Sequence, residues 1–221
     1  MTTTPPPAGA RRVVVMDVDS TLITGEVIEM LAAHAGSLEL VTDVTERAMR
    51  GELDFTASLH ERVATLAGLP VSVFDTVGQE ITLTDGAGQF VDELHRRGWP
   101  VGLVSGGFTE LVRPLARRLG IGFVRANSLQ VRDGVLTGAV EGPVIDPHAK
   151  AEALKELAGM HGVPLDHAVA IGDGANDLLM LREAGLGVAF NAKPVVAEQA
   201  DVAVAGGRLD AVLEVIDRHH P

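Results

Sequence analysis

The sequence contains no cysteine among its 221 residues, and this absence removes several kinds of chemistry at once. Without thiols there is no disulfide, no thiolate nucleophile and no zinc–thiolate site. A reducing compartment is the natural expectation, so we predict a cytoplasmic protein. The first residues, MTTTPPPAGARR, lack the apolar segment of a secretory signal peptide, which favours the same location.

Long apolar runs and aromatic side chains are also scarce. No stretch approaches the roughly 20 apolar residues that span a bilayer, so we expect no membrane partner. Aromatic residues make up 3% of the chain and hydrophobic residues 46%, which predicts a core of Val, Leu, Ile and Ala. The length allows one α/β domain with a modest insertion, or two small domains.

Basic residues are few: 18 Lys and Arg stand against 30 Asp and Glu, for a formal net charge of -12. This balance argues against nucleic-acid binding, which needs Lys and Arg to neutralise phosphates. It is compatible with a small phosphorylated molecule if a few cations are placed locally. An acidic protein that handles phosphate would also benefit from a divalent metal ion.

The order of the expected elements predicts an α/β fold, because apolar strands alternate with amphipathic helices along most of the chain. One stretch shows helical spacing without a confident strand, and Asp43 and Asp54 are its candidate N-caps. Alternating residues around Asp133-Gly134 predict a β-hairpin. The predicted division is a disordered Thr- and Pro-rich tail (1–11), a core domain (12–24 and 85–221) and an inserted helical domain (25–84).

Polar clusters stand near the ends of several of these elements. The clusters are Asp17 and Asp19 after an apolar strand, Ser105-Gly106-Gly107 after VGLV, Lys150 near a helix start, and Asp173 to Asp177 after VAIG. Parallel sheets bind ligands at the carboxyl ends of their strands. We therefore expect the clusters to meet in one crevice.

The residue types in this crevice indicate a metal ion and a phosphate. Close carboxylates raise one another's pKa unless a cation intervenes, and oxygen-only ligands favour Mg²⁺ over Ca²⁺. A serine hydroxyl with exposed glycine N–H groups at a helix start forms a seat for an anion. Lys150 can neutralise developing negative charge, and Asn176 can donate another hydrogen bond.

Asp17 and Asp19 lie two residues apart and would repel each other if both were ionised, so we expect them to have different roles. A carboxylate can attack phosphorus and form an aspartyl-phosphate, and Asp17 is nearest the strand end. Asp19 can protonate the departing alkoxide and then deprotonate the water that hydrolyses the intermediate.

Four ordered motifs, DVDST, SGG, Lys150 and GDGAND, resemble those of the haloacid dehalogenase superfamily of aspartate-nucleophile phosphatases. The segments GEVIEMLA, AMRGELDF, ANSLQVRDGVLTG and AFNAKP are similar to the phosphoserine phosphatase family within it, over about residues 12–216. The resemblance implies a Rossmannoid parallel-sheet core with an inserted helical cap domain and a small β-hairpin. It also implies Mg²⁺-dependent hydrolysis of O-phospho-L-serine to L-serine and phosphate, the last step of L-serine biosynthesis.

The same resemblance implies roles for residues in the cap. Glu26 matches the ligand of the substrate ammonium, Arg62 matches the clamp on its carboxylate, and Met49 and Phe55 match the apolar lining. It places the metal on Asp17, the backbone carbonyl of Asp19, and Asp173. Thr21 and Asp177 are expected to support the site.

Each residue also has a simpler interpretation that the sequence leaves open. Charged residues such as Glu26, Arg62, Lys150 and Asp177 are common on solvated helices, SGG is common in turns, and apolar residues usually form core. The function also has alternatives: another phosphomonoester such as phosphoethanolamine, phosphate transfer to an acceptor such as homoserine, or an inactive phosphoamino-acid sensor. A monomer or a homodimer is expected.

Overall fold

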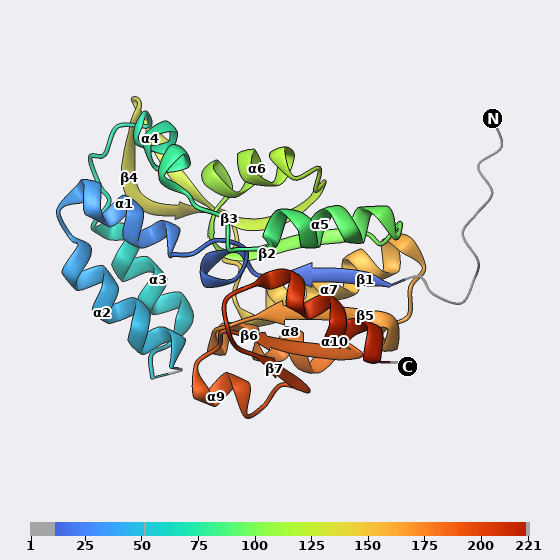
Figure 1. Cartoon of the computed structure of the whole chain (residues 1–221). Helices are drawn as coiled ribbons and strands as arrows, with labels where there is room; N and C mark the ends of the chain where they lie inside the picture. Colours follow the sequence, from blue (N-terminus) through green and yellow to red (C-terminus); the bar gives the residue numbers. More distant parts are fainter. Residues whose placement is uncertain (1–11, 51, 220–221) are drawn as a thin grey trace, which may run out of the picture.

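The computed structural model describes residues 12–50 and 52–219, so the predicted tail, residues 1–11, lies outside the described residues. Seven strands form one sheet in the order β4-β3-β2-β1-β5-β6-β7 (Figure 1). All neighbouring strands are parallel except β3 and β4, which form the predicted hairpin. The α/β fold expected from the sequence is therefore confirmed. The strands are β1 (Val13–Met16), β2 (Val101–Phe108), β3 (Phe123–Arg132), β4 (Val135–Glu141), β5 (Ala168–Gly172), β6 (Leu186–Phe190) and β7 (Val202–Val204).

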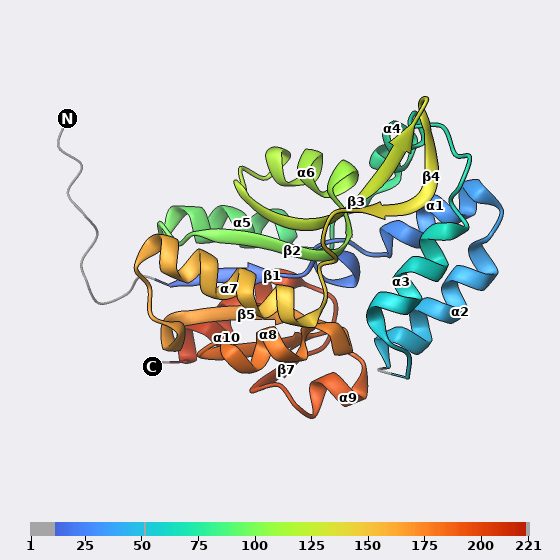
Figure 2. The same cartoon turned by 180° about the vertical axis from the view of Figure 1, so that it is seen from behind.

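Helices cover both faces of the sheet, as Figure 2 shows from behind. Val14 and Met16 of β1 belong to one core cluster, and Val13 and Val15 belong to the other, because successive strand side chains alternate in direction. The first cluster includes α5 (Ala87–Arg96), α6 (Thr109–Arg118) and α10 (Val212–Arg218). The second includes α7 (Pro147–His161), α8 (Leu178–Glu183) and α9 (Pro194–Ala197). Burial on both faces explains the continuous apolar runs of the central strands.

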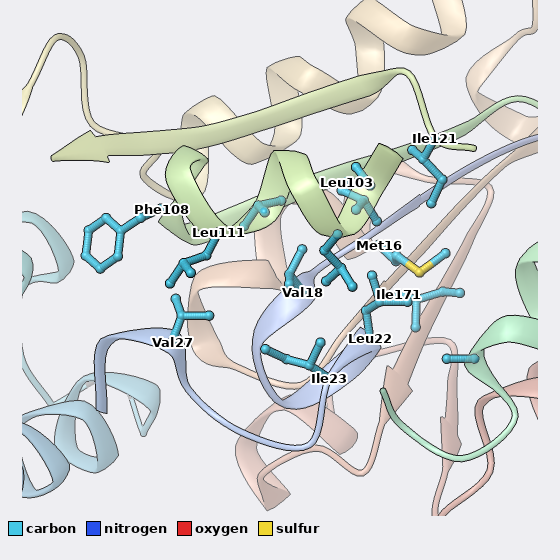
Figure 3. Close-up of a cluster of buried hydrophobic side chains, with 14 of the residues drawn as sticks. Met16, Val18, Leu22, Ile23, Val27, Leu103, Phe108, Leu111, Ile121 and Ile171 are labelled. Carbon is cyan, nitrogen blue, oxygen red and sulfur yellow. The ribbon is translucent and has the colours of Figure 1, made fainter. Parts of the chain in front are cut away.

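The larger core cluster is mainly aliphatic, as the composition predicts. Figure 3 shows Met16, Leu22, Ile23 and Leu103 packed beside the turn that follows β1. Burying side chains of this size contributes about 1.5–3 kcal/mol each. Well-packed apolar residues of this cluster therefore support the turn that carries Asp17 and Asp19.

The predicted insertion is helical and gathers beside one end of the sheet (Figure 1). It contains α1 (Val27–Ala35), α2 (Leu38–Met49), α3 (Phe55–Ala64) and α4 (Val73–Glu80), of which α4 was not predicted. The Asp54 carboxylate accepts a hydrogen bond from Ala57 N at 2.8 Å, so this predicted N-cap is confirmed. The prediction for Asp43 is wrong: α2 starts at Leu38 after Ser37, and Asp43 lies inside the helix.

Two chain segments join the insertion to the sheet, and they pair with each other. Ile23 and Leu83 form an antiparallel bridge, Thr24 N donates to Thr82 O at 3.0 Å, and Thr84 N donates to Leu22 O at 2.9 Å. These bonds attach the insertion to the end of the sheet that is formed by the carboxyl ends of the parallel strands. Within residues 12–50 and 52–219, no helix has the length and apolar character needed to cross a membrane.

Candidate active site

The polar clusters predicted from the sequence meet at the carboxyl ends of β1, β2 and β5. Asp17 follows β1 directly, and its backbone N donates to Ile171 O of β5 at 2.9 Å. A cavity here is lined by residues from the carboxyl ends of these strands and from the helical insertion. It is lined by Asp17, Asp19, Glu26, Val27, Ile28, Thr45, Ala48, Phe55, Leu59, Arg62, Gly106, Gly107, Asp173 and Asn176.

Lys150 projects from α7 into the acidic cluster and is completely buried. Its Nζ lies 2.8 Å from Asp17 Oδ2 and 2.7 Å from Asp177 Oδ1. Burial alone would lower the pKa of Lys150, but the two carboxylates outweigh this effect and raise it. The side chain is therefore a fixed ammonium rather than a solvated helix lysine.

Asp177 organises the loop after β5. Its Oδ2 accepts hydrogen bonds from the backbone N atoms of Asp173 and Gly174, both at 3.1 Å. Gly172 is required beside it, because a Cβ at that position would lie 2.4 Å from Asp177 Cγ. With Oδ1 on Lys150 and Oδ2 on two amides, this carboxylate holds the loop in place.

Asp17, Asp173 and Asp177 form a buried cluster that fits a metal ion, since one oxygen from each lies within 4.8 Å of the others. Burial raises the pKa of both Asp17 and Asp173, and the neighbouring Asp177 raises both further. A divalent cation would relieve this repulsion, and a set of oxygen donors suits a hard cation. Thr21 Oγ1 donates to Asp173 Oδ1 at 3.2 Å and orients it.

Asp19 turns away from this cluster. Its Oδ1 accepts from Val27 N at 2.8 Å, and its Oδ2 accepts from Ser105 Oγ at 2.9 Å. The two aspartates therefore do not crowd each other, because one faces Lys150 and the other faces the insertion and β2. Burial raises the pKa of Asp19, which suits a group that exchanges a proton.

Ser105, Gly106 and Gly107 lie within β2, so the prediction of a glycine turn after the strand is wrong. The strand continues to Phe108 with an irregular register against β3. The glycines instead allow the strand to lie close to Asp19 and Phe55. A Cβ on Gly107 would lie 2.7 Å from Asp19 Oδ2, and one on Gly106 would lie 3.0 Å from Phe55 Cζ. Gly107 N donates to Ser105 Oγ at 2.8 Å, which puts an N–H and a hydroxyl together.

The insertion brings a cation and an acid to the same cavity. Arg62 is buried, and its Nε donates to Ser58 O at 3.0 Å while Nη1 donates to Thr45 Oγ1 at 3.0 Å. Ser20 Oγ donates to Glu26 Oε1 at 2.6 Å. Burial, and after it the nearby Asp19, raise the pKa of Glu26 to about 8.

Among the other predicted residues, Phe55 and Asn176 line the cavity. Met49 ends α2, and its side chain lies outside the described residues. All the other predicted site residues reach the cavity or contact a residue that lines it. The roles predicted for them remain hypotheses.

Two buried residues of the site were missed in the sequence. Thr45 holds Arg62, as described above. Asn127 of β3 donates from Nδ2 to Gly106 O at 2.8 Å and accepts at Oδ1 from Ile145 N at 2.8 Å. Neither residue stands out in the sequence, because the strand of Asn127 also carries Arg125, Ser128 and Gln130, and Thr45 lies within a helix.

A parallel α/β sheet with a buried aspartate cluster at its carboxyl end fits the class of aspartate-dependent phosphohydrolases, and comparison with known families agrees. The family model for haloacid dehalogenase-like hydrolase matches residues 14–182. The chain therefore belongs to the haloacid dehalogenase-like hydrolase family.

Within this family the chain is similar to proteins named phosphoserine phosphatase. It is 54% identical over 203 residues to phosphoserine phosphatase SerB2 of Mycobacterium tuberculosis and 57% identical over 207 residues to that of Streptomyces coelicolor. These matches cover 92% and 94% of this chain but 50% of each relative, so the chain spans about half their length. The Streptococcus thermophilus phosphoserine phosphatase is 52% identical over 92% of this chain and 94% of its own.

Solved structures show the same similarity. A phospho-aspartyl intermediate analogue of phosphoserine phosphatase aligns with a TM-score of 0.90 and 41% identity, over 93% of this chain and 99% of that chain. A substrate-bound phosphoserine phosphatase complex also aligns with a TM-score of 0.90 and 41% identity, over 93% of this chain and 98% of that chain.

Proposed function

We propose that this chain hydrolyses O-phospho-L-serine to L-serine and phosphate with Mg²⁺ as its cofactor. The observation that carries the proposal is the shared cavity, which is lined by Asp17 and Asp19 together with Arg62 and Glu26. The first pair suits phosphoryl transfer, and the second suits the carboxylate and ammonium of an amino acid. The names of the similar proteins, phosphoserine phosphatases, support the same substrate.

Each end of phosphoserine has a chemically matched partner. The Arg62 guanidinium has donors beyond those used by Ser58 and Thr45, and a planar fork suits a carboxylate. Glu26 supplies a counter-charge for the ammonium. Lys150 and Asn176 supply donors for the phosphate oxygens. Ser105 Oγ and Gly107 N–H would join them by exchanging their present bonds to Asp19 Oδ2 and to Ser105 Oγ.

In the first step, an Asp17 carboxylate oxygen attacks phosphorus. The new oxygen–phosphorus bond forms as the bond from phosphorus to the seryl oxygen breaks, and Asp19 transfers its proton to the departing alkoxide. Lys150, 2.8 Å from Asp17 Oδ2, favours the ionised form of the nucleophile before attack.

In the second step, water attacks the aspartyl-phosphate. Asp19, now a carboxylate, removes a proton from the water, and the bond between phosphorus and Asp17 breaks to release phosphate. The side chains of Phe55, Leu59 and Ile28 line the cavity and limit the entry of further water. Both steps thus return Asp17 and Asp19 to their starting forms.

Asp17, Asp173 and the backbone carbonyl of Asp19 would hold Mg²⁺, with Asp177 and Thr21 in support. When bound, Mg²⁺ would offset the charge of the carboxylates and of the phosphate. Residues 25–84 would act as a cap domain over the 12–24 and 85–221 core. A cytoplasmic location and a monomeric or homodimeric state stay predictions.

The test is phosphate release from a panel of phosphomonoesters with Mg²⁺, including phosphoserine and phosphoethanolamine. We expect the highest kcat/KM with phosphoserine, and we expect Asp17→Asn to abolish turnover. Appreciable activity in that variant would contradict the assignment of the nucleophile. A preference for phosphoethanolamine would contradict the substrate, and no turnover of any phosphomonoester would favour an inactive sensor.

A further inference from the structure

Ser20 adopts a backbone conformation that L-residues rarely take. Its φ is 53° and its ψ is 2°, in the left-handed region, within the turn that carries Asp19. The other non-glycine residues with positive φ among the described residues are Asp133 and Asn191, types that tolerate this region better. Glycine would fit the position without steric cost, so the serine side chain must provide something else.

The side chain of Ser20 contacts the amino-acid end of the cavity. Its Oγ donates to Glu26 Oε1 at 2.6 Å, and its backbone N donates to Gly25 O at 3.1 Å. Among the described residues, no other hydrogen-bond donor reaches the Glu26 carboxylate. The loop from Ser20 to Glu26 is thereby closed at both the backbone and the side chain.

This contact fixes one carboxylate oxygen of Glu26 and leaves Oε2 as an acceptor. Glu26 is the residue just before α1 and has no side-chain bond to the helix end, so nothing in its own element orients it. A glutamate side chain loses considerable rotamer freedom when it is ordered. The Ser20 hydroxyl removes that freedom before a ligand binds.

We propose that Ser20 is a positioning residue for specificity: its hydroxyl holds Glu26 to receive the ammonium of the substrate. The proposal rests on the proposed function in one respect, namely that Glu26 binds this ammonium. Because Ser20 directly follows Asp19, the same turn carries the proton-transfer group and the support for the amine-binding group. Substrate selection and chemistry therefore share one turn of the chain.

The alternative is that Ser20 matters only for the shape of the turn. Ser20→Gly removes the hydroxyl and suits the left-handed backbone, whereas Ser20→Ala removes the hydroxyl and keeps the backbone constraint. Equal effects of the two variants would identify the hydroxyl as the important group. Asp133→Gly, at an exposed hairpin turn with φ of 51°, is the control for a glycine at a positive-φ position.

The experiment compares phosphoserine with the phosphate ester of 3-hydroxypropanoate, which differs by lacking the amine. We expect Ser20→Gly and Ser20→Ala to raise KM for phosphoserine about 5- to 20-fold, with kcat changed less than about threefold. Both variants should change kcat/KM for the amine-free ester by no more than about twofold. Asp133→Gly should leave the ratio of the two substrates unchanged.

A double-mutant cycle separates action through Glu26 from a direct effect. In a Glu26→Gln background, Ser20→Gly should cause little further loss with phosphoserine. Equal losses with both substrates, or a full additional loss in that background, would overturn the inference while leaving the proposed function intact. A wild-type protein that does not prefer phosphoserine over the amine-free ester would instead overturn the proposed substrate, and this inference with it.

Discussion

Lys150 and Asp17 form an ion pair inside the protein, with Nζ 2.8 Å from Oδ2 and side-chain exposures of 0% and 6%. Lys150 also lies 2.7 Å from Asp177, so one ammonium serves two buried carboxylates. Desolvation makes such groups costly unless each is paired. The stability of the site and its chemistry therefore depend on the same side chain.

Lys150→Met keeps a side chain of similar length and removes the charge. We expect the unfolding free energy in metal-free buffer at pH 7 to fall by about 3–5 kcal/mol, because two buried carboxylates lose their partner. Phosphatase activity should fall at least about 100-fold. Urea unfolding and phosphate release measure the two effects.

Lys155→Met is the matched control on the same helix. Lys155 is 37% exposed and pairs with surface glutamates, so its replacement should change stability by less than about 1 kcal/mol. A similar small change for both lysines would show that the Lys150 charge is not needed by the acidic cluster.

Metal binding should stabilise the protein as well as activate it. Chelation should abolish turnover, and added Mg²⁺ should restore it and raise the melting temperature, because a cation offsets the repulsion of Asp17, Asp173 and Asp177. Asp173→Asn should raise the Mg²⁺ concentration needed for half of the thermal shift by about tenfold or more. Asp92→Asn, at an exposed carboxylate of α5, should leave the shift unchanged. A melting temperature that does not change when Mg²⁺ is added would contradict the metal site.

Thr45 should act on substrate choice through Arg62. Thr45→Val keeps the shape but removes the hydroxyl that accepts from Nη1 at 3.0 Å. Loss of about 1 kcal/mol of hydrogen bonding corresponds to a roughly fivefold rise in KM for phosphoserine. Phosphoethanolamine, which has no carboxylate, should be unaffected.

Two comparisons complete this test. Thr76→Val, at an exposed position of α4, should change neither substrate. Arg62→Ala should weaken phosphoserine far more than phosphoethanolamine. Equal losses with both would exclude Arg62 as a carboxylate clamp.

Much of the catalytic end of the site was predictable, because parallel strands bring their carboxyl ends together. Asp17, Ser105 and Asp173 are near neighbours for this reason, although they are far apart in the sequence. The directions of the side chains were not predictable in the same way. Asp19 turns away from Asp17 within an irregular turn, in which Asp19 and Ser20 depart from helical geometry, and no periodic pattern reveals this turn.

The helical insertion was harder to predict from the sequence, because tertiary packing determines where its helices begin and which side chains meet. The polar residue Asp43 looked like an N-cap, yet α2 begins earlier and includes it. The SGG segment looked like a turn, but its glycines allow β2 to approach Asp19 and Phe55. The contact between Thr45 and Arg62 joins two helices, so spacing along one helix could not predict it.

Glu26 should leave a pH signature in the stability of the metal-free protein. Its pKa is about 8 in the folded protein, raised by burial and by Asp19 from the usual value of 4.5. Between these pH values the folded state binds more protons than the unfolded state, so this group makes the unfolding free energy fall as pH rises. Glu26→Gln cannot titrate and should show a smaller fall.

Urea unfolding at pH 5 and pH 8.5 measures the difference. Between pH 5 and pH 8.5, we expect the unfolding free energy of Glu26→Gln to rise by about 1–3 kcal/mol relative to that of the wild type. This is less than the full pKa shift of Glu26 implies, because its side chain is partly exposed. Asp17 and Asp173 are present in both proteins, so their own titration largely cancels in the comparison. Glu39→Gln, at an exposed position, should follow the wild type. A gap between wild type and Glu26→Gln that stays constant with pH would mean that Glu26 is already ionised in the metal-free protein at pH 5.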